Sequence, residues 1–331
     1  MISLGSNERV TAPVAPVVSC KIIGVGGAGL ALLEKLAGGI SGAPDLVAMH
    51  TDAQALMTSS APRKLQLGRD TAKGLGAGGD PALGQAAAKE QADEVRAECD
   101  GAQIAVVCAG LGGGTGSGAA PVVAHEARKA GALVLGVVTL PFAGEGGKRR
   151  EQAAASLARL GRSCAAVVCF ENDRMGEIVP PGAPATEAVQ AASDTMSRAV
   201  VAILRMVGLP SLMHVGLDEL VQLFRGADAR CQFGHGAASG PDRADLAVEQ
   251  ALGSPLLDDG KMLPGSGNVL VHITGDASLR FGEMQSVLGA VARHLPESAQ
   301  VFLGVSTDPR SEDSLGVTIM ASTRTGGVPM P

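Results

Sequence analysis

Residues 110–118 read GLGGGTGSG, so six glycines fall within nine positions. Glycine loses more conformational freedom on folding than any other residue, and such a run weakens regular structure unless its backbone has a task. The stretch follows AQIAVVCAG (102–110), which is typical of a buried strand, and precedes AAPVVAHEARKAG (119–131), which is typical of a helix. We therefore expect a strand, a glycine loop and a helix, with Pro121 near the first helical turn, where proline is tolerated.

A glycine loop in front of a helix is suited to binding an anion. The helix N-terminus presents unpaired N–H groups and a partial positive charge, which together favour phosphate. Glycines let the backbone close around the anion, while Thr115 and Ser117 offer hydroxyl donors. A flexible surface turn is the alternative, which the flanking strand and helix disfavour. The stretch is not a Walker P-loop, because no Gly-Lys pair in the chain completes that motif.

Two further glycine-rich stretches are GVGGAG (24–29) and GLGAGGDP (74–81). GVGGAG fits the G-x-G-x-x-G pattern of dinucleotide-binding folds, with Asp52 at the place of their acidic residue. A helix cap is the alternative role for Asp52, since Asp is favoured there. A dinucleotide fold does not require a third glycine loop, whereas three loops that open at one sheet edge are suited to holding one polyphosphate.

The composition limits the class of protein. The chain has 331 residues, of which 46% are hydrophobic and 18% charged, as expected of a folded protein with room for two domains. A net charge of −6 argues against broad binding to nucleic acid or anionic membranes. None of the six cysteines forms a C-x-x-C pair, which favours buried, reduced thiols over a zinc site or disulfides. Because no run suits a signal peptide or a membrane span, we expect a cytoplasmic protein.

Strand-like and helix-like segments alternate along most of the chain. LVLGVVTLPF (133–142) and AAVVCFEND (165–173) add strands, and residues 81–99 are typical of one helix with an early proline. This order predicts an α/β fold with a doubly wound, mostly parallel sheet. The stretch 186–207 is helical and apolar around most of its circumference, which indicates a long helix buried between two layers. Three strands after residue 267 predict a second α/β domain.

The motifs stand in the order of a known family. GGGTGSG matches the signature loop of the tubulin/FtsZ superfamily, and residues 19–324 resemble the FtsZ family of bacterial cell-division proteins. Beside the three glycine loops, the resemblance is carried by HTDAQAL (50–56), TLPFAGEGGKR (139–149), NDR (172–174), ASGPDRA (238–244), SPLL (254–257) and NVLVHITG (268–275). A motif series of this length is highly specific.

The resemblance implies a tubulin/FtsZ-like fold and head-to-tail filaments with GTP or GDP held between subunits. It implies a GTP-binding domain over 19–183, a central helix over 184–209 and a C-terminal domain over 210–325 that aids assembly and carries the GTPase-activating loop. We expect a flexible arm (1–18) and a short tail (326–331) at the ends. Mg²⁺ is expected to bind mainly through the nucleotide, since no protein cage for it is visible.

The resemblance also implies which residues hold the nucleotide. The phosphates would lie against residues 114–116 with help from 27–29, and residues 76–77 would face the terminal phosphate. Glu145 and Arg149 would lie by the ribose, with a solvated charge pair as their alternative. The full set of candidates is Gly26, Gly27, Ala28, Gly29, Ala31, Asp52, Gly76, Ala77, Gly112, Gly113, Gly114, Thr115, Gly116, Ser117, Glu145, Arg149, Asn172, Val189, Ser193 and Asp194.

Three positions depart from the family pattern near the base. Ala31 replaces a usual Asn, and Val189 replaces an aromatic residue on the central helix. Ser193 stands where Asp or Asn contacts guanine, with Asp194 next to it. A carboxylate accepts two hydrogen bonds from the N–H edge of guanine, whereas a serine supplies at most one. We therefore expect weakened selectivity for GTP over ATP.

A larger departure concerns catalysis. In the family a loop after the central helix, roughly N-x-D-x-x-D, reaches the neighbour's nucleotide, and its acids position the attacking water. Here LMHVGLDELVQLF (212–224) has His214 for Asn, Gly216 for the first Asp and Glu219 for the second. Loss of such a carboxylate slows hydrolysis by orders of magnitude. Glu219 and Asp218 are the catalytic candidates; the alternative is that both only stabilise a helix N-terminus.

The sequence thus predicts an FtsZ-like GTPase that forms head-to-tail filaments and hydrolyses GTP slowly, in trans. Two alternatives stay open: a non-hydrolysing structural or regulatory FtsZ paralogue, and a Rossmann-type oxidoreductase based on GVGGAG. The expected partners are further copies of the chain, or another FtsZ, and no nucleic acid. Family members usually continue into a linker and an adaptor-binding peptide; because this chain ends at Pro331, we expect no direct or adaptor-mediated membrane binding by that route.

Overall fold

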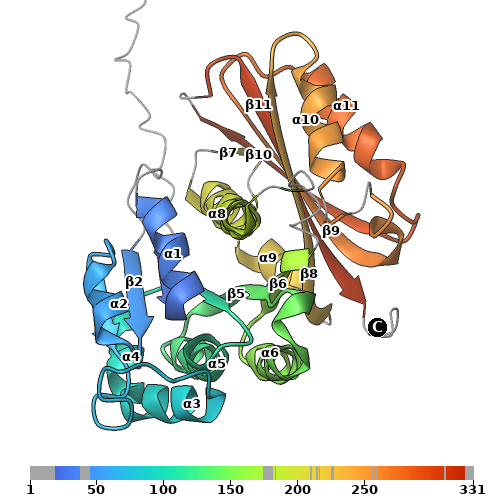
Figure 1. Cartoon of the computed structure of the whole chain (residues 1–331). Helices are drawn as coiled ribbons and strands as arrows, with labels where there is room; N and C mark the ends of the chain where they lie inside the picture. Colours follow the sequence, from blue (N-terminus) through green and yellow to red (C-terminus); the bar gives the residue numbers. More distant parts are fainter. Residues whose placement is uncertain are drawn as a thin grey trace, which may run out of the picture.

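A computed structural model gives the fold of the chain (Figure 1). It describes residues 19–37, 45–173, 182, 184–208, 211–213, 215, 217–224, 227–254, 256–257, 260–308 and 311–324. The arm expected at 1–18 and the tail expected at 326–331 lie outside the described residues. The same holds for His214 and Gly216 of the expected catalytic loop.

The first part of the described chain forms a parallel sheet. Its strands pair in the order β3-β2-β1-β4-β5-β6, and each of these pairings is parallel. The sheet is doubly wound, because the chain leaves the central β1 first toward β2 and later toward β4. The strands are β1 (Cys20–Val25), β2 (Asp45–His50), β3 (Arg63–Gln66), β4 (Ile104–Gly110), β5 (Leu133–Leu140) and β6 (Ala166–Glu171).

Helices cover both faces of this sheet, as Figure 1 shows. Strand side chains alternate between the faces, so Ile22 and Val106 pack in one core while Ile23 and Val107 pack in another. One face carries α1 (Gly26–Ala37) and α8 (Ala185–Gly208); the other carries α3 (Pro81–Glu90), α5 (Gly114–Lys129) and α6 (Gly147–Leu160). The shorter elements are α2 (Ala53–Thr58), α4 (Ala92–Cys99) and the 3₁₀ turn η1 (Ala143–Glu145). None of the helices in the described ranges has the length and apolar character needed to cross a bilayer.

A second, mixed sheet continues from β6. The two sheets meet at the pair Val168 and Cys231, and the order then runs β8-β11-β9-β10-β7. β11 is antiparallel to both neighbours, whereas β9 and β10 are parallel. The elements are β7 (Ser211–Met213), α9 (Leu217–Phe224), β8 (Ala227–Ser239), α10 (Arg243–Leu252), η2 (Leu263–Gly265), β9 (Ser266–Gly275), α11 (Phe281–Ala292), β10 (Gln300–Thr307) and β11 (Ser314–Arg324). The predicted fold class, a doubly wound sheet followed by a second α/β unit, is confirmed.

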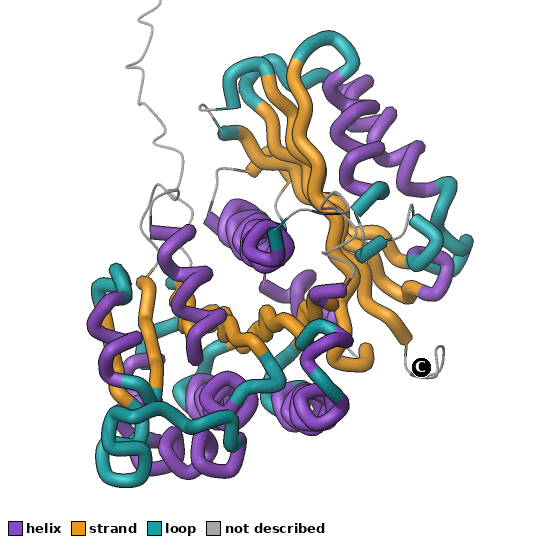
Figure 2. The backbone as a smooth tube through the Cα atoms, in the orientation of Figure 1, coloured by secondary structure: helices purple, strands orange, loops and turns teal. Residues whose placement is uncertain are grey.

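α8 is the long helix that the sequence predicts between two layers. Its Met196, Val200 and Ile203 side chains are at most 2% exposed and share one core with both sheets. Phe170 of β6 and Phe233 of β8 meet edge to face in this core, with 6.3 Å between ring centres. Figure 2 shows the helix between the two sheets, so α8 connects the two halves of the molecule.

α5 begins earlier than the sequence predicts. It starts at Gly114 rather than near residue 119, so the expectation that Pro121 lies near the first turn is wrong. An interior proline removes the N–H that would bond the carbonyl four residues back, here that of Ser117. This carbonyl instead accepts hydrogen bonds from Ser156 Oγ (2.7 Å) and Arg159 Nη2 (3.3 Å) of α6. The neighbouring helix thereby compensates for the proline.

The single helix expected over 81–99 is two helices. Gln91 separates α3 from α4, with non-helical backbone angles (φ −100°, ψ 23°). Its buried side chain accepts a hydrogen bond from Gly68 N, in the turn after β3. Glu90 beside it accepts hydrogen bonds from Asp70 N (2.9 Å) and Thr71 N (3.0 Å). The break therefore ties both helices to that turn.

Five cysteines have described side chains, and none of them forms a disulfide in the described part of the chain: Cys20, Cys99, Cys108, Cys164 and Cys169. Burial raises the pKa of Cys20 and Cys164 to about 12 and the pKa of Cys99 to about 11. These thiols stay protonated at neutral pH. Of the five, Cys99 and Cys108 are buried as expected, whereas Cys20, Cys164 and Cys169 are partly buried.

Candidate functional site

Three glycine-bearing segments meet at the carboxyl edge of the parallel sheet. β1 leads into α1 at Gly26, β4 leads into α5, and the segment 74–80 leads into α3. A methyl group on Gly26 would lie 3.0 Å from Gly116 N, and one on Gly114 would lie 2.8 Å from Ala77 Cβ. The three loops are therefore in contact. They meet beside β1 and β4, where the strand order reverses and where ligands of doubly wound folds bind.

The glycines at this edge fall into two groups. A Cβ on Gly116 would lie 2.1 Å from Gly110 O, and Gly118 is similarly enclosed by α3, so these glycines permit close packing. Gly113, the N-cap of α5, has nothing within 4 Å of that position, and neither has Gly27. The open backbone at the starts of α1 and α5 is therefore the part that can face an anion.

The hydroxyls of Thr115 and Ser117 have partners within the protein. Thr115 Oγ1 lies 2.6 Å from Thr51 Oγ1 after β2, and the fully buried Ser117 Oγ accepts a hydrogen bond from Gly112 N (2.7 Å). Gly112 has a φ of 104°, which glycine adopts readily and other residues rarely do. Ser117 thus holds the loop in shape. Its backbone N–H lies at the fourth position of α5, where Gly113 O can accept it, so a role for Ser117 in nucleotide binding stays a prediction.

Asp52 caps α2 and borders the third glycine loop. Its Oδ1 accepts hydrogen bonds from Gln54 N (2.8 Å) and Ala55 N (3.1 Å), which is the cap role that the sequence left open. A Cβ on Gly76 would lie 3.9 Å from Asp52 Oδ2, and Gly76 N donates to Thr51 O (3.2 Å). The segment around Gly76 is therefore fixed against the end of β2.

Glu145, Arg149 and Asn172 follow the next two strands, β5 and β6. Glu145 forms an ion pair with Arg149 across one helical turn and accepts a hydrogen bond from Phe142 N (2.9 Å). Asn172 Oδ1 is buried and has no hydrogen-bond partner in the described part of the chain. A buried acceptor without a donor is destabilising, so Asn172 suits a ligand that donates a hydrogen bond. A ribose hydroxyl or a base amino group supplies one.

The base-side candidates lie on α1 and α8. Asp194 forms an ion pair with Lys35 of α1, and Ser193 beside it is half-buried. Ala31 is exposed on α1, and its methyl group neither donates nor accepts a hydrogen bond. Val189 belongs to α8, but its side chain is outside the described set. The Asp194 carboxylate is thus already paired with the Lys35 ammonium group, and Ser193 is the neighbouring candidate for a contact with the base.

The catalytic candidates lie apart from the glycine loops. Asp218 and Glu219 occupy the first turn of α9, where carboxylates also stabilise the helix N-terminus. α9 packs on the second sheet, and Asn268 Nδ2 at the start of β9 donates to Gln222 O (2.8 Å). α9 contacts β9 and β11, and Figure 1 shows it in the middle of the molecule, above β6 and α6. Asp218 and Glu219 are therefore not brought together with the described glycine loops of their own chain.

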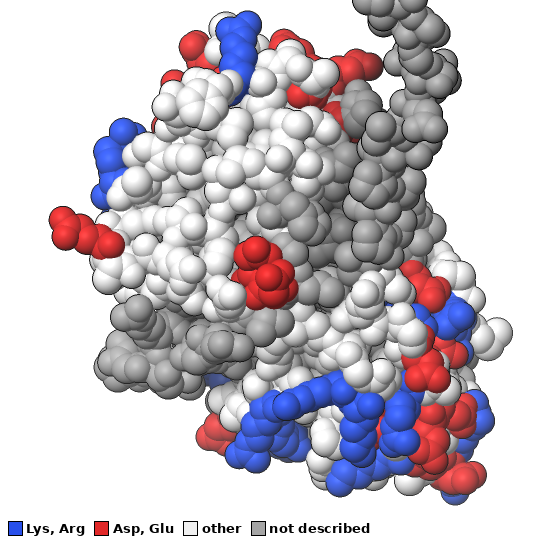
Figure 3. All heavy atoms as spheres, turned by 180° about the vertical axis from the view of Figure 1, so that it is seen from behind, with Lys and Arg blue, Asp and Glu red and all other residues white. Residues whose placement is uncertain are grey.

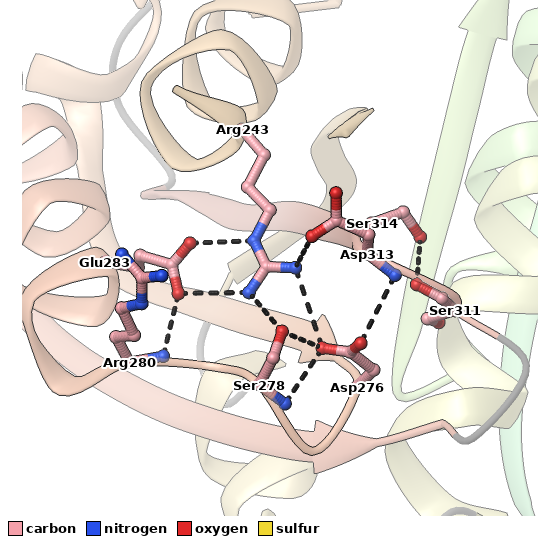
Figure 4. Close-up of polar contacts among 8 residues, drawn as sticks. All are labelled: Arg243, Asp276, Ser278, Arg280, Glu283, Ser311, Asp313 and Ser314. Carbon is pink, nitrogen blue, oxygen red and sulfur yellow. Dashed lines mark hydrogen bonds and ion pairs between the residues drawn. The ribbon is translucent and has the colours of Figure 1, made fainter. Parts of the chain in front are cut away.

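A buried arginine to which the sequence assigned no role lies in the second domain. Arg243 is 3% exposed, and its Nε donates to Glu283 Oε1 (2.7 Å). Its Nη1 lies 3.3 Å from Asp313 Oδ1 and 3.6 Å from Asp276 Oδ1. Figure 4 shows these carboxylates around the guanidinium, which joins the loop after β9 to the loop before β11. The motif ASGPDRA contains Arg243, but nothing in that motif signals its burial.

The comparisons with known proteins agree with this geometry. Residues 19–180 match the model of the Tubulin/FtsZ family, GTPase domain, and residues 230–325 match the FtsZ family, C-terminal domain. Cell division protein FtsZ 1 of Archaeoglobus fulgidus is 38% identical over 304 residues, which cover 91% of this chain and 81% of that protein.

Two solved structures show the same architecture. The empty FtsZ dimer of M. jannaschii has a TM-score of 0.83 at 32% identity and covers 95% of both chains. The GTPgS-bound protofilament of CetZ2 from Haloferax volcanii has a TM-score of 0.74 at 25% identity, over 93% of this chain and 94% of that one. The converging glycine loops, the central helix and these matches show that the chain belongs to the FtsZ family of tubulin-like GTPases.

Proposed function

We propose that this protein binds GTP or GDP where its three glycine loops meet and assembles head to tail into filaments. The observation that carries the proposal is the open backbone at Gly27, Gly113 and the first turn of α5. Bare amides at helix N-termini favour phosphate oxygens. The FtsZ-family match decides against an oxidoreductase, although GVGGAG does lie between β1 and α1 as a dinucleotide loop would.

The surrounding residues fit a nucleotide that extends from these amides. We assign the terminal phosphate to Gly76 and Ala77, the ribose to Glu145 and Arg149, and a ribose or base donor to Asn172. The buried, unpaired Oδ1 of Asn172 supports the last assignment. Mg²⁺ would be held mainly by the phosphates, because it retains several waters and takes few protein ligands at such sites.

The placement of the catalytic candidates fits hydrolysis in trans. The glycine loops lie on the first sheet, whereas α9, which carries Glu219, packs on the second sheet, and in the FtsZ-like filament that we propose a second subunit would bring Glu219 to the nucleotide. Exposed apolar side chains lie on both parts of the molecule: Leu75 (86% exposed) in the 74–80 loop of the first, and Leu212 (67%) on β7 and Phe281 (71%) on α11 of the second. Contact between such unlike surfaces is heterologous and generates filaments when the rotation does not close a ring.

Slow hydrolysis follows from the composition of residues 214–219. Glu219 keeps a carboxylate on a longer arm, and Gly216 lacks one. A positioned general base or water-orienting group contributes about 10²–10⁴-fold to a rate. We therefore expect measurable but slow phosphate release that depends on assembly.

Phosphate release from GTP tests this assignment. Glu219→Ala is expected to lower the rate by at least about a hundredfold, whereas Gly216→Asp, which restores the family's acid, is expected to raise it. Asp218→Ala removes the neighbouring carboxylate of the same helix turn and tests the second catalytic candidate in the same assay. An unchanged rate in Glu219→Ala would remove Glu219 from catalysis.

A second candidate function is a nucleotide-binding paralogue without turnover. Gly216 in place of an acid favours it, and the likeness to CetZ2 shows that the fold occurs outside FtsZ itself. In this case the protein alone releases no phosphate, and release appears only when it is mixed with an FtsZ that carries the missing acids.

The remaining partner predictions rest on charge. Figure 3 shows basic side chains gathered in the lower part of the rear face with acidic side chains among them. Arg69 pairs with Glu94 and Arg96 with Glu126, which reduces the positive field available to a polyanion. We propose a cytoplasmic protein without a nucleic-acid partner or direct membrane binding, whose main partner is a second copy of this chain.

A further inference from the structure

A cavity of about 220 Å³ lies between α8 and the inner face of the second sheet. Pockets for drug-sized ligands measure roughly 300–1,000 Å³, so this cavity suits a smaller molecule. None of its lining residues belongs to the glycine loops. The polar lining residues are Ser197, Arg198, His235, His272, Thr274 and Thr318.

The polar wall follows from the register of three strands. Thr318 of β11 is paired with His235 of β8 on one side and with His272 of β9 on the other, so the three residues form one row. Two positions earlier on the same strand faces, Phe233 and Leu270 are buried in the core around α8. The apolar contact between helix and sheet therefore ends where this polar row begins.

The two imidazoles are held by hydrogen bonds within the sheet. His235 Nδ1 lies 3.0 Å from Thr318 Oγ1, and His272 Nε2 lies 2.9 Å from Ser306 Oγ of β10. Gly304 makes room for the second ring, because a Cβ there would lie 2.8 Å from His272 Cδ2. The wall thus presents imidazole and hydroxyl groups in fixed positions.

Arg198 supplies a full positive charge on the opposite wall. It is an exposed residue of α8, and it forms no ion pair within the part of the chain that the structure describes. No lining residue is acidic. A guanidinium pairs with a carboxylate through two parallel hydrogen bonds, and hydroxyl and imidazole groups bond well to an oxygen-rich molecule.

We propose that this cavity binds a small organic carboxylate. One carboxylate group lies at Arg198, and the rest of the molecule extends toward the row of His235, Thr318 and His272. The binding is independent of the nucleotide, since the two sites share no residue. The Arg198 guanidinium and the imidazole and hydroxyl groups on the facing wall favour a carboxylate over an apolar molecule. The small volume of the cavity excludes a nucleotide.

Calorimetric titration of the full chain with succinate tests the proposal, with GDP present to fill the glycine loops. Succinamide, which has the same shape without charge, is the matched probe. We expect succinamide to bind at least about tenfold more weakly than succinate, which is the loss expected for one charge-assisted, bidentate pair. Arg198→Gln should lower the affinity for succinate by a similar factor. Arg293→Gln, at the C-cap of α11 and outside the lining of the cavity, should leave succinate binding unchanged.

Three outcomes would overturn the proposal. The first is that millimolar succinate does not bind, and the second is that succinate and succinamide bind equally. The third is that Arg198→Gln binds succinate as tightly as the wild type does, or that GDP abolishes succinate binding. Either result would mean that succinate binds outside this cavity. If GDP itself does not bind, only the proposed nucleotide site fails. The affinities of Arg198→Gln and Arg293→Gln for succinate still decide whether succinate binds in this cavity.

Discussion

Gly113 and Gly116 are three residues apart in one motif, yet their surroundings differ. Gly113 lies open at the start of α5, whereas a Cβ on Gly116 would lie 2.1 Å from the Gly110 carbonyl oxygen of β4. The first is free to face a ligand, and the second is required for the helix to approach the sheet. Substitution by alanine separates these two tasks.

Gly116→Ala is expected to lower the free energy of unfolding by about 1–3 kcal/mol, because the methyl group forces the helix away from β4. Gly113→Ala is the matched control and should change it by less than about 0.5 kcal/mol, since its position is open and its φ of −93° suits alanine. Urea denaturation of both variants measures the difference. Equal losses would contradict this division of the glycines.

Ser193 and Asp194 make the nucleotide preference testable. Because Lys35 pairs with Asp194, and Ser193 supplies at most one hydrogen bond to guanine, the wild-type protein should prefer GTP over ATP only weakly. Ser193→Asp is expected to raise that preference by about tenfold or more, since a carboxylate accepts two hydrogen bonds from guanine. Calorimetric titration with GTP and with ATP measures both proteins. A strong GTP preference in the wild type would show that another residue contacts the base.

The sequence predicted which loops meet, but it did not predict which glycines face outward. The glycine pattern around α5 is local, whereas the enclosure of Gly116 by β4 and of Gly118 by α3 depends on tertiary packing. Ser117 illustrates the same limit: its buried hydroxyl accepts a hydrogen bond from Gly112 N, a contact that the local sequence does not indicate. The local sequence indicates that a loop can bind an anion. Tertiary packing decides which of its residues face the ligand and which hold the loop in place.

At the scale of elements, β8 was not expected from the sequence. ADARCQFGHGAAS (227–239) alternates apolar and polar residues over 227–233, but it contains no β-branched residue and carries glycines at 234 and 236. Its glycines are contact points for α10: a Cβ on Gly234 would lie 2.2 Å from Ala251 O, and one on Gly236 would lie 2.2 Å from Ala247 O. A helix packed this closely requires glycine in the strand, which removes the usual signal.

Arg243 and its partners Asp276, Ser278, Glu283 and Asp313, called the Arg243 network here, connect α10 and α11 with the loops after β9 and before β11. Loss of these contacts should therefore lower the stability of the fold. Arg243→Gln is expected to lower the free energy of unfolding at pH 7 by about 3 kcal/mol, because carboxylates gathered around the guanidinium lose their partner. Arg280→Gln is the control, since Arg280 contributes its backbone N–H to Glu283 Oε2 (2.7 Å) and keeps that N–H in the variant. Urea denaturation measures both variants.

The same network predicts a pH dependence. The hydrogen bond from Arg243 lowers the pKa of Glu283, and the hydrogen bond from the Ser278 hydroxyl lowers that of Asp276. Groups with lowered pKa values stabilise the fold above their ordinary pKa, near 4.5 for Glu283, and lose that contribution as the pH falls through the folded value. The difference in stability between wild type and Arg243→Gln should therefore shrink below about pH 4.5. A difference that stays constant down to pH 3 would contradict the assignment.

At the scale of the whole molecule, the sequence predicted a long helix between two layers because residues 186–207 are apolar around most of their circumference. It did not predict how the two sheets join, because one residue pair, Val168 with Cys231, carries that contact. The separation of the glycine loops from the α9 loop is likewise a property of the assembled fold. The proposed filament is the arrangement that would bring these two regions together.

Filament contacts should depend on Phe281, which the Arg243 network holds in an exposed position at the start of α11. Phe281→Asp is expected to reduce the protein that sediments with GTP by at least about half, because a charge replaces apolar area that is buried on association. Leu246→Asp, at a 45% exposed position on α10, is the matched control and should sediment as the wild type does. GTP affinity should be unchanged in both variants. Equal sedimentation of both variants with the wild type would place the contact elsewhere.

The central claim is that one guanine nucleotide occupies the place where the three glycine loops meet, and a crystal structure with a non-hydrolysable GTP analogue tests it most directly. The account predicts triphosphate density against the backbone amides of residues 113–116, with Gly76 and Ala77 at its end and the ribose beside Asn172. Density for the analogue at another place, with the amides beside Thr115 facing only water, would contradict it.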